Sequence, residues 1–129
     1  MPSFSQASLR ELATLHPDLR MVLREAIKRV DFSVLEGFRG EEKQNKAFDE
    51  GKSKLRWPQG RHNVWPSRAV DIAPWPIDWT DTERFVLLAG YILAVADRLG
   101  VKLRWGGDWD SDWKLKEEKF RDYGHFELA

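Results

Sequence analysis

Residues 61–71 of the chain read Arg-His-Asn-Val-Trp-Pro-Ser-Arg-Ala-Val-Asp, and residues 122–127 read Asp-Tyr-Gly-His-Phe-Glu. Together these stretches hold two of the three histidines of the chain. Catalytic zinc usually takes three side chains from histidine, aspartate and glutamate, and it keeps one further position open for water. His62, Asp71 and His125 would supply such a set. We therefore expect these distant stretches to meet at a zinc site.

The segment 69–73, Ala-Val-Asp-Ile-Ala, reads as a β-strand. Successive side chains of a strand point to opposite faces, so Val70 would face the core while Asp71 faces a cleft. A metal ligand on a strand needs this orientation.

The C-terminal segment predicts a second strand with the same property. His125 and Glu127 would share one face, while Phe126 and Leu128 take the other. Glu127 would then hydrogen-bond the His125 ring and support it. Asp122 lies three residues before His125, with a glycine between them. A carboxylate in that place can take a proton from an attacking water and later pass it to the leaving amine.

The spacing of these residues is only moderately specific for zinc. The His-Glu-x-x-His motif of many metallopeptidases is absent. A histidine near an aspartate is more often a hydrogen-bonded pair than a metal site. The residue pattern by itself therefore leaves a structural pair and a metal site both open.

The order of the motifs resembles that of the bacteriophage L-alanyl-D-glutamate endopeptidase endolysins. These belong to the D-alanyl-D-alanine carboxypeptidase (VanY-like) class of zinc peptidases and share a fold with the hedgehog signalling domain. The motifs that carry the resemblance are Leu15-His16-Pro17-Asp18-Leu19, Gly37-Phe38-Arg39 with Gln44, His62 to Asp71 followed by Ile72-Ala73-Pro74, Arg104 to Trp109, and Asp122 to Leu128. The resemblance implies zinc held by His62, Asp71 and His125, with Asp122 as catalytic base.

Two positions depart from the family pattern. Many relatives have a serine where this chain has Gly60, and many have a shorter, glycine-containing gap between the first histidine and the aspartate. Neither departure changes the identity of a ligand, and Pro66 with Ser67 can form a turn before the strand begins.

The amino-acid composition disfavours some classes of function and excludes others. Lys plus Arg and Asp plus Glu both number 21 in 129 residues, so no net basic field favours nucleic acid or anionic lipid. The absence of cysteine excludes disulfides, thiolate zinc sites and a cysteine nucleophile. No signal peptide or membrane-spanning stretch is recognisable. We expect one catalytic domain over residues 1–129, a monomer without a separate cell-wall-binding domain.

Hydrophobic periodicity and cap residues predict a small α+β domain, with an antiparallel sheet flanked by helices. Capping boxes are expected at Ser8–Glu11 and Thr80–Glu83. The remaining expected elements are a helix opened by Pro17 and Asp18 with His16 as a structural residue at its start, a strand over residues 32–36, a helix from Glu41 to Glu50, a long helix closed by Gly100 and a strand over residues 101–105.

Further candidates surround the predicted zinc site. Arg39 would donate to a substrate carbonyl or carboxylate and stabilise the oxyanion, and Gln44 would support the site or contact substrate. Seven tryptophans exceed the needs of so small a core, so we expect Trp105 and Trp109 to line a groove. The run Asp108, Asp110, Asp112 lacks the offsets of an EF-hand and is interpreted as a solvated loop.

The resulting hypothesis, which follows from the family resemblance, is a phage zinc peptidase that cuts the L-alanyl-D-glutamate bond in the stem peptide of bacterial peptidoglycan during host lysis. The family implies that it collects in the host cytoplasm until another protein opens the membrane. A D-alanyl-D-alanine carboxypeptidase or dipeptidase, a non-catalytic zinc domain of the same fold, and a metal nuclease suggested by His62-Asn63 are the alternatives. The presence of Asp122 disfavours the non-catalytic domain, and zero net charge disfavours the nuclease.

Overall fold

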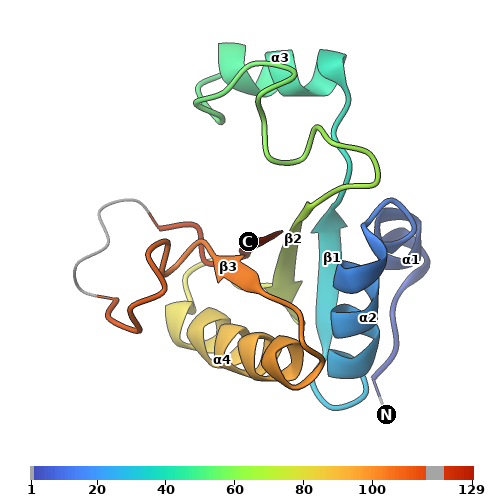
Figure 1. Cartoon of the computed structure of the whole chain (residues 1–129), viewed down its shortest axis with the longest axis vertical. Coiled ribbons are helices and arrows are strands. Elements are labelled where there is room, and N and C mark those ends of the chain that lie inside the picture. The colour runs from blue at the N-terminus through green and yellow to red at the C-terminus, as the bar shows by residue number, and fades with distance from the viewer. Residues whose placement is uncertain (1, 116–120) are drawn as a thin grey trace.

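The computed structural model describes residues 2–115 and 121–129. Within this part of the chain, helices pack around one antiparallel sheet in an α+β arrangement (Figure 1), which confirms the predicted class. The elements are α1 (Gln6–Leu12), α2 (Pro17–Ala26), β1 (Phe32–Glu36), α3 (Glu41–Asp49), β2 (Ala69–Pro74), α4 (Thr82–Arg98), β3 (Leu103–Trp105) and β4 (His125–Leu128).

The strands form one sheet in the order β1-β2-β4-β3, and all neighbouring pairs are antiparallel. β4, the last strand in the sequence, lies between β2 and β3, so the C-terminal segment is central. The β1–β2 register shifts between Val34 and Glu36, and this irregularity places Glu36 opposite Asp71.

One face of the sheet forms the core. Val70 and Ile72 of β2 and Phe126 of β4 are at most 1% exposed and belong to the main hydrophobic cluster. α1 packs on β1, and α4 packs on β2 and β3 and also contacts α2. The opposite face carries Asp71 and His125, because side chains alternate along each strand. This confirms the strand parity predicted for both segments.

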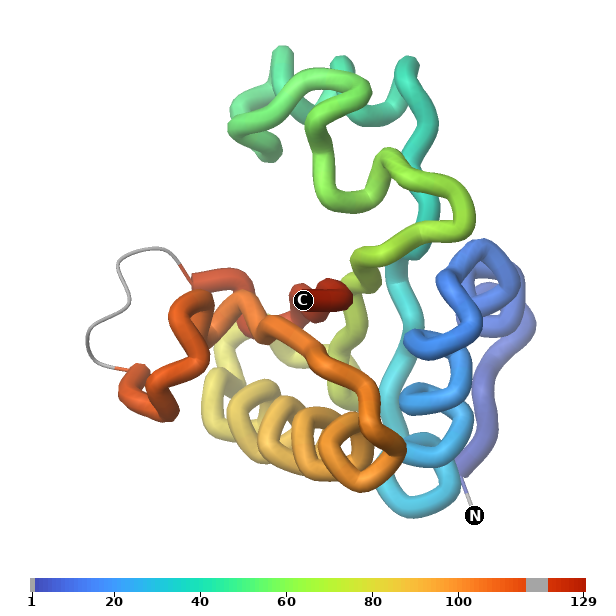
Figure 2. Tube along the Cα trace, viewed as in Figure 1, coloured from blue at the N-terminus to red at the C-terminus, as the bar shows by residue number. Residues whose placement is uncertain are grey.

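α3 and the chain that follows it extend away from this body. In Figure 2 they lie at the opposite end of the molecule from α4. The chain returns from this end to β2 through residues 50–68, which include His62. The segment that carries the first histidine is therefore long and mostly irregular.

The first predicted capping box is wrong. α1 begins after Ser5, whose side chain accepts from the Ser8 amide at 3.1 Å. Ser8 lies inside the first turn, where its hydroxyl accepts from the Val34 amide at 2.9 Å. Glu11 accepts from the Gly37 amide at 3.1 Å. Both polar side chains fix β1 against α1 instead of capping their own helix.

The second predicted capping box is also wrong by one residue. Asp81 is the N-cap of α4, and its carboxylate accepts from the Arg84 amide at 3.3 Å. Thr80 instead donates its hydroxyl to Asp78 at 2.7 Å. An aspartate is as good an N-cap as a threonine, so the local sequence offered two adjacent starts.

The other element boundaries agree closely with expectation. His16 caps α2, its Nδ1 accepting from the Asp18 amide at 3.0 Å, and Pro17 occupies the first turn. The strand predicted over residues 101–105 is shorter, because the Val101 amide still donates to Ala96 at the end of α4. No helix in the described residues is long and apolar enough to cross a membrane.

The adjacent leucines of α4 allow a matched test of this packing. Leu88 is 4% exposed and Leu87 is 77% exposed. We expect Leu88→Ala to lower the free energy of unfolding by about 2–5 kcal/mol, since it leaves a cavity in the core. Leu87→Ala should change it by less than about 0.5 kcal/mol. Urea unfolding of both variants checks this, and equal effects would contradict the assigned face of the helix.

Candidate metal centre

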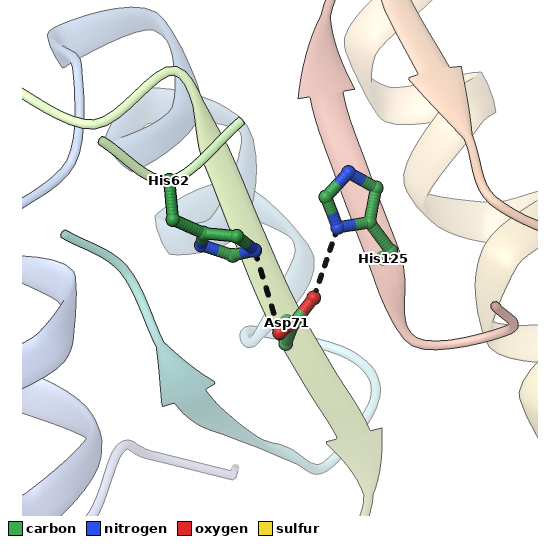
Figure 3. Close-up of side chains that lie close together, drawn as sticks. All are labelled: His62, Asp71 and His125. Atoms are coloured by element: carbon green, nitrogen blue, oxygen red, sulfur yellow. Dashed lines mark hydrogen bonds and ion pairs between the residues drawn. The ribbon is translucent and has the colours of Figure 1, made fainter. Parts of the chain in front are cut away.

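Three side chains from separate parts of the chain converge on the open face of the sheet (Figure 3). Asp71 of β2 is paired in register with His125 of β4, and His62 enters from the preceding loop. Asp71 Oδ2 lies 3.4 Å from His62 Nε2, and Asp71 Oδ1 lies 3.1 Å from His125 Nδ1. The two imidazole centroids are 5.3 Å apart. The structure thus brings together the three predicted ligands.

The orientation of His62 is fixed from behind. Its Nδ1 lies 2.8 Å from the carbonyl oxygen of Gly37, a contact that requires a proton on Nδ1. The His62 carbonyl accepts from the Arg39 amide at 2.8 Å. The Nδ1 contact leaves Nε2 as the nitrogen that faces Asp71, and the bond from the Arg39 amide holds the backbone that carries the ring.

His125 is fixed by Glu127. The His125 Nε2 lies 2.9 Å from Glu127 Oε1, and both residues are buried. In the neutral ring, a proton on Nε2 would leave the Nδ1 lone pair directed toward Asp71 and able to bind a metal ion. The predicted contact between Glu127 and His125 is present, and it follows from their shared strand face.

The donor set fits a zinc ion. One ligand atom from each of His62, Asp71 and His125 lies within 4.8 Å of the other two. Two imidazole nitrogens and a carboxylate oxygen are ordinary zinc donors, and each imidazole has its other nitrogen engaged by the protein. The histidine side chains are 6% and 7% exposed and that of Asp71 is 27% exposed, so the cluster is open on the aspartate side.

The electrostatics of the cluster favour a cation. Burial alone would raise the pKa of Asp71, but hydrogen bonds to His125 and His62 hold that pKa well below its usual value. Burial alone would lower the pKa of His125, but hydrogen bonds to Asp71 and Glu127 raise it to about 9. In the metal-free protein a proton on His125 therefore occupies the place that a metal ion would take.

Asp122 is held beside this cluster by Gly106. The Asp122 amide donates to the Gly106 carbonyl at 2.8 Å, and the Gly106 amide donates to His125 at 2.8 Å. A Cβ on residue 106 would lie 2.2 Å from the Asp122 carbonyl oxygen, so only glycine allows this approach. Desolvation raises the pKa of Asp122, and the Asp71 charge raises it further. Both effects favour a carboxylate that can accept and release a proton.

Arg39 is anchored next to the ligand strand. Its guanidinium pairs with Glu36 and donates from Nη1 to Gln44 at 3.0 Å. Because Glu36 is the register partner of Asp71, this pair lies beside the cluster. Arg39 contacts Glu36 and Gln44, and its predicted role toward substrate stays a prediction.

Gln44 supports the ligand loop from inside. It is fully buried, so direct contact with substrate, one of the two roles predicted for it, is wrong. Its Oε1 accepts from Asn63 at 3.1 Å, and its Nε2 donates to Ser53 at 2.9 Å. Asn63 in turn accepts from the Gly60 amide at 2.7 Å. The loop around His62 is therefore tied to α3.

The long gap between His62 and Asp71 is anchored elsewhere. The Ser67 amide donates to Thr14 at 2.8 Å, and the His16 amide donates to Ser67 at 2.8 Å. These bonds fasten the loop to the connection between α1 and α2. The departure from the family pattern thus leaves the ligands in place.

The two predicted groove tryptophans differ. Trp105 is the register partner of Phe126, so its ring faces the core and is only 5% exposed. Its assignment to the groove is wrong. Trp109 lies 5.4 Å from the His125 ring between centroids, and its role at the groove stays a prediction.

The run Asp108, Asp110, Asp112 is only partly the solvated loop that was predicted. Asp110 and Asp112 are exposed, as a solvated loop requires, but Asp108 is 6% exposed. Its carboxylate accepts from the Trp113 amide at 2.8 Å and the Asp112 amide at 3.3 Å. Asp108 therefore organises the loop from within.

Comparison with known proteins agrees with this geometry. Residues 2–129 match the family described as phage L-alanyl-D-glutamate peptidase. The chain belongs to this peptidase family. It is 32% identical over 134 residues to the L-alanyl-D-glutamate peptidase of Escherichia phage T5, across 98% of this chain and 97% of that protein. It is also similar to the crystal structure of the Serratia marcescens L-Ala D-Glu endopeptidase ChiX, with a TM-score of 0.78, 28% identity and coverage of 98% and 90%.

Several residues of this peptidase that organise the site were not predicted. Glu36 and Asn63 position Arg39 and the His62 loop, and Arg61 and Arg104 flank Glu127. Glu36 and Arg39 are only three residues apart, but pairing at that spacing is expected on a helix, and Glu36 lies in β1. The other contacts join segments distant in sequence and left no local signal.

Gly60 offers a test of the ligand loop in the peptidase. A Cβ there would lie 2.5 Å from Asn63 Oδ1 and 2.6 Å from Gln44 Oε1. We expect Gly60→Ala to displace the loop and weaken zinc binding about tenfold to a hundredfold. Gly90→Ala is the control, because nothing lies within 4 Å of the added Cβ. Competition with a chromogenic chelator measures both, and wild-type affinity in Gly60→Ala would contradict the assigned packing.

Proposed function

We propose that the protein is a zinc peptidase that hydrolyses the L-alanyl-D-glutamate bond in the stem peptide of bacterial peptidoglycan. The carrying observation is the convergence of His62, Asp71 and His125, with donor atoms within 4.8 Å, on the open face of the sheet. Membership of the phage L-alanyl-D-glutamate peptidase family supports the choice of bond. The donor set supports zinc as the metal.

The protein residues perform distinct tasks in this reaction. Zinc at the cluster would polarise the scissile carbonyl and acidify the attacking water. Asp122 accepts the proton of that water as the new carbon–oxygen bond forms. It then donates the proton to the amine of the D-glutamyl product as the carbon–nitrogen bond breaks. Glu127 keeps His125 in the orientation that the cluster requires.

Arg39 is assigned to the oxyanion. A guanidinium held by Glu36 beside the ligand strand can donate to the negative oxygen that develops during attack. We expect Arg39→Ala to lower kcat about tenfold or more with zinc content unchanged. A steady-state assay with metal analysis measures both quantities, and an unaltered rate would reduce Arg39 to a structural partner of Glu36.

The partners and setting follow from the same proposal. We infer a monomer that acts on peptidoglycan, without nucleic acid or membrane insertion. The phage family supports retention inside the host cell until lysis, when another protein opens the membrane. The substrate groove is assigned to the open side of Asp71, with Trp109 at its wall.

The direct test is digestion of purified peptidoglycan by the zinc-loaded protein, with and without chelator, followed by mass spectrometry. Glycan carrying free L-alanine ends and released peptides beginning with D-glutamate are expected. Release of terminal D-alanine alone would move the assignment to a carboxypeptidase. Absence of any chelator-sensitive product would favour a non-catalytic zinc domain.

Separate variants distinguish the proton carrier from a ligand. Asp122→Asn should keep zinc and lose about a hundredfold or more in kcat, because the amide cannot accept the proton. His125→Ala should lose both zinc and activity. Asp97→Asn, an exposed carboxylate on α4, is the control and should retain both. Full activity in Asp122→Asn would overturn the assignment.

A further inference from the structure

Two arginines from different parts of the chain meet beside the metal cluster. Arg61 Nε and Arg104 Nη1 each lie 3.9 Å from Oε2 of Glu127. Arg61 directly precedes His62, and Arg104 of β3 is the register partner of Glu127 on β4. One side chain, Glu127, therefore separates both guanidinium groups from His125.

Glu127 uses only part of the donor capacity of these arginines. Its Oε1 is taken by His125 at 2.9 Å, and its Oε2 faces two positive charges. Among the described residues, neither guanidinium makes a hydrogen bond within normal distance. A guanidinium has five N–H donors in a planar fork that matches a carboxylate.

The arginines are also accessible. The side chains of Arg61 and Arg104 are 62% and 41% exposed, whereas that of Glu127 is 7% exposed. Two cations around one buried anion leave a net positive charge at the rim of the cluster. This charge is local, because the chain as a whole has a formal net charge of zero.

The proposed substrate presents a matching anion. D-glutamate contributes its amine to the scissile bond and has two carboxyl groups. Continuation of the stem peptide consumes one of them, so the other stays free within a few bonds of the scissile amide. A carboxylate at that distance can reach side chains that border the metal ligands.

We propose that Arg61 and Arg104 form a carboxylate subsite that binds the free carboxylate of the D-glutamyl residue next to the scissile bond. The subsite rests on the proposed function and adds a specificity rule to it. Substrates in which this carboxylate is amidated are cleaved less efficiently, because a neutral amide loses the attraction of both guanidinium groups.

The test uses two synthetic peptides, N-acetyl-L-alanyl-D-glutamyl-L-lysine linked through the γ-carboxyl, with the α-carboxyl either free or a primary amide. The zinc-loaded wild-type protein should show a kcat/KM ratio of about tenfold to a hundredfold in favour of the free acid. Arg61→Gln with Arg104→Gln should bring the ratio close to one. Arg29→Gln, an exposed arginine distant from the cluster, is the control and should keep the wild-type ratio.

Zinc content and thermal unfolding of each variant separate loss of the subsite from loss of fold. If the double variant loses zinc, Arg104→Gln alone, on β3 and away from the ligand loop, should still lower the ratio severalfold. Equal cleavage of both peptides by the wild-type protein would overturn the subsite and leave the proposed function intact. Cleavage of neither peptide, together with no chelator-sensitive digestion of whole peptidoglycan, would overturn the proposed function and the subsite with it.

Discussion

The pairing of Asp71 with His125 across β2 and β4 is the constraint on which the site depends. It places a carboxylate and an imidazole on one face of the sheet while Val70 and Phe126 enter the core on the other. A slip of one residue in either strand would turn the charged side chains of that strand toward the core and its apolar side chains away from it. The packing of the hydrophobic core and the grouping of the candidate metal ligands therefore require the same strand register.

The third ligand depends on a different kind of interaction. His62 lies in an irregular segment, where no strand pairing fixes its position. Hydrogen bonds among buried polar groups hold this segment instead. Gln44, Asn63 and the carbonyl of Gly37 each supply a contact that would be costly to leave unmade away from water. Such a network holds a loop in one arrangement only when all of its members are satisfied. This explains why a residue as small as Gly60 is needed within it.

Charge distribution around the cluster supports both parts of the chemistry. Asp71 lies between two histidines, which hold its pKa low, whereas burial and the nearby charge of Asp71 raise the pKa of Asp122. The pKa values of the two carboxylates are therefore shifted in opposite directions. The charged Asp71 suits a metal ion, and Asp122 suits proton transfer. Arg61 and Arg104, which lie next to Glu127, add positive charge at the rim of the site. An anionic group of the proposed substrate would therefore be attracted to this rim.

The sequence by itself determined the features that depend on local pattern. Alternation along two segments predicted which side chains of β2 and β4 face the core, and residue chemistry with the family resemblance predicted the three ligands. The tertiary structure decided the helix caps at Ser5 and Asp81, the burial of Trp105 and the convergence of Arg61 with Arg104. Those outcomes depend on which distant groups compete for a hydrogen bond or a place in the core. Periodicity reports only the face of an element, and the partner on that face is chosen by packing.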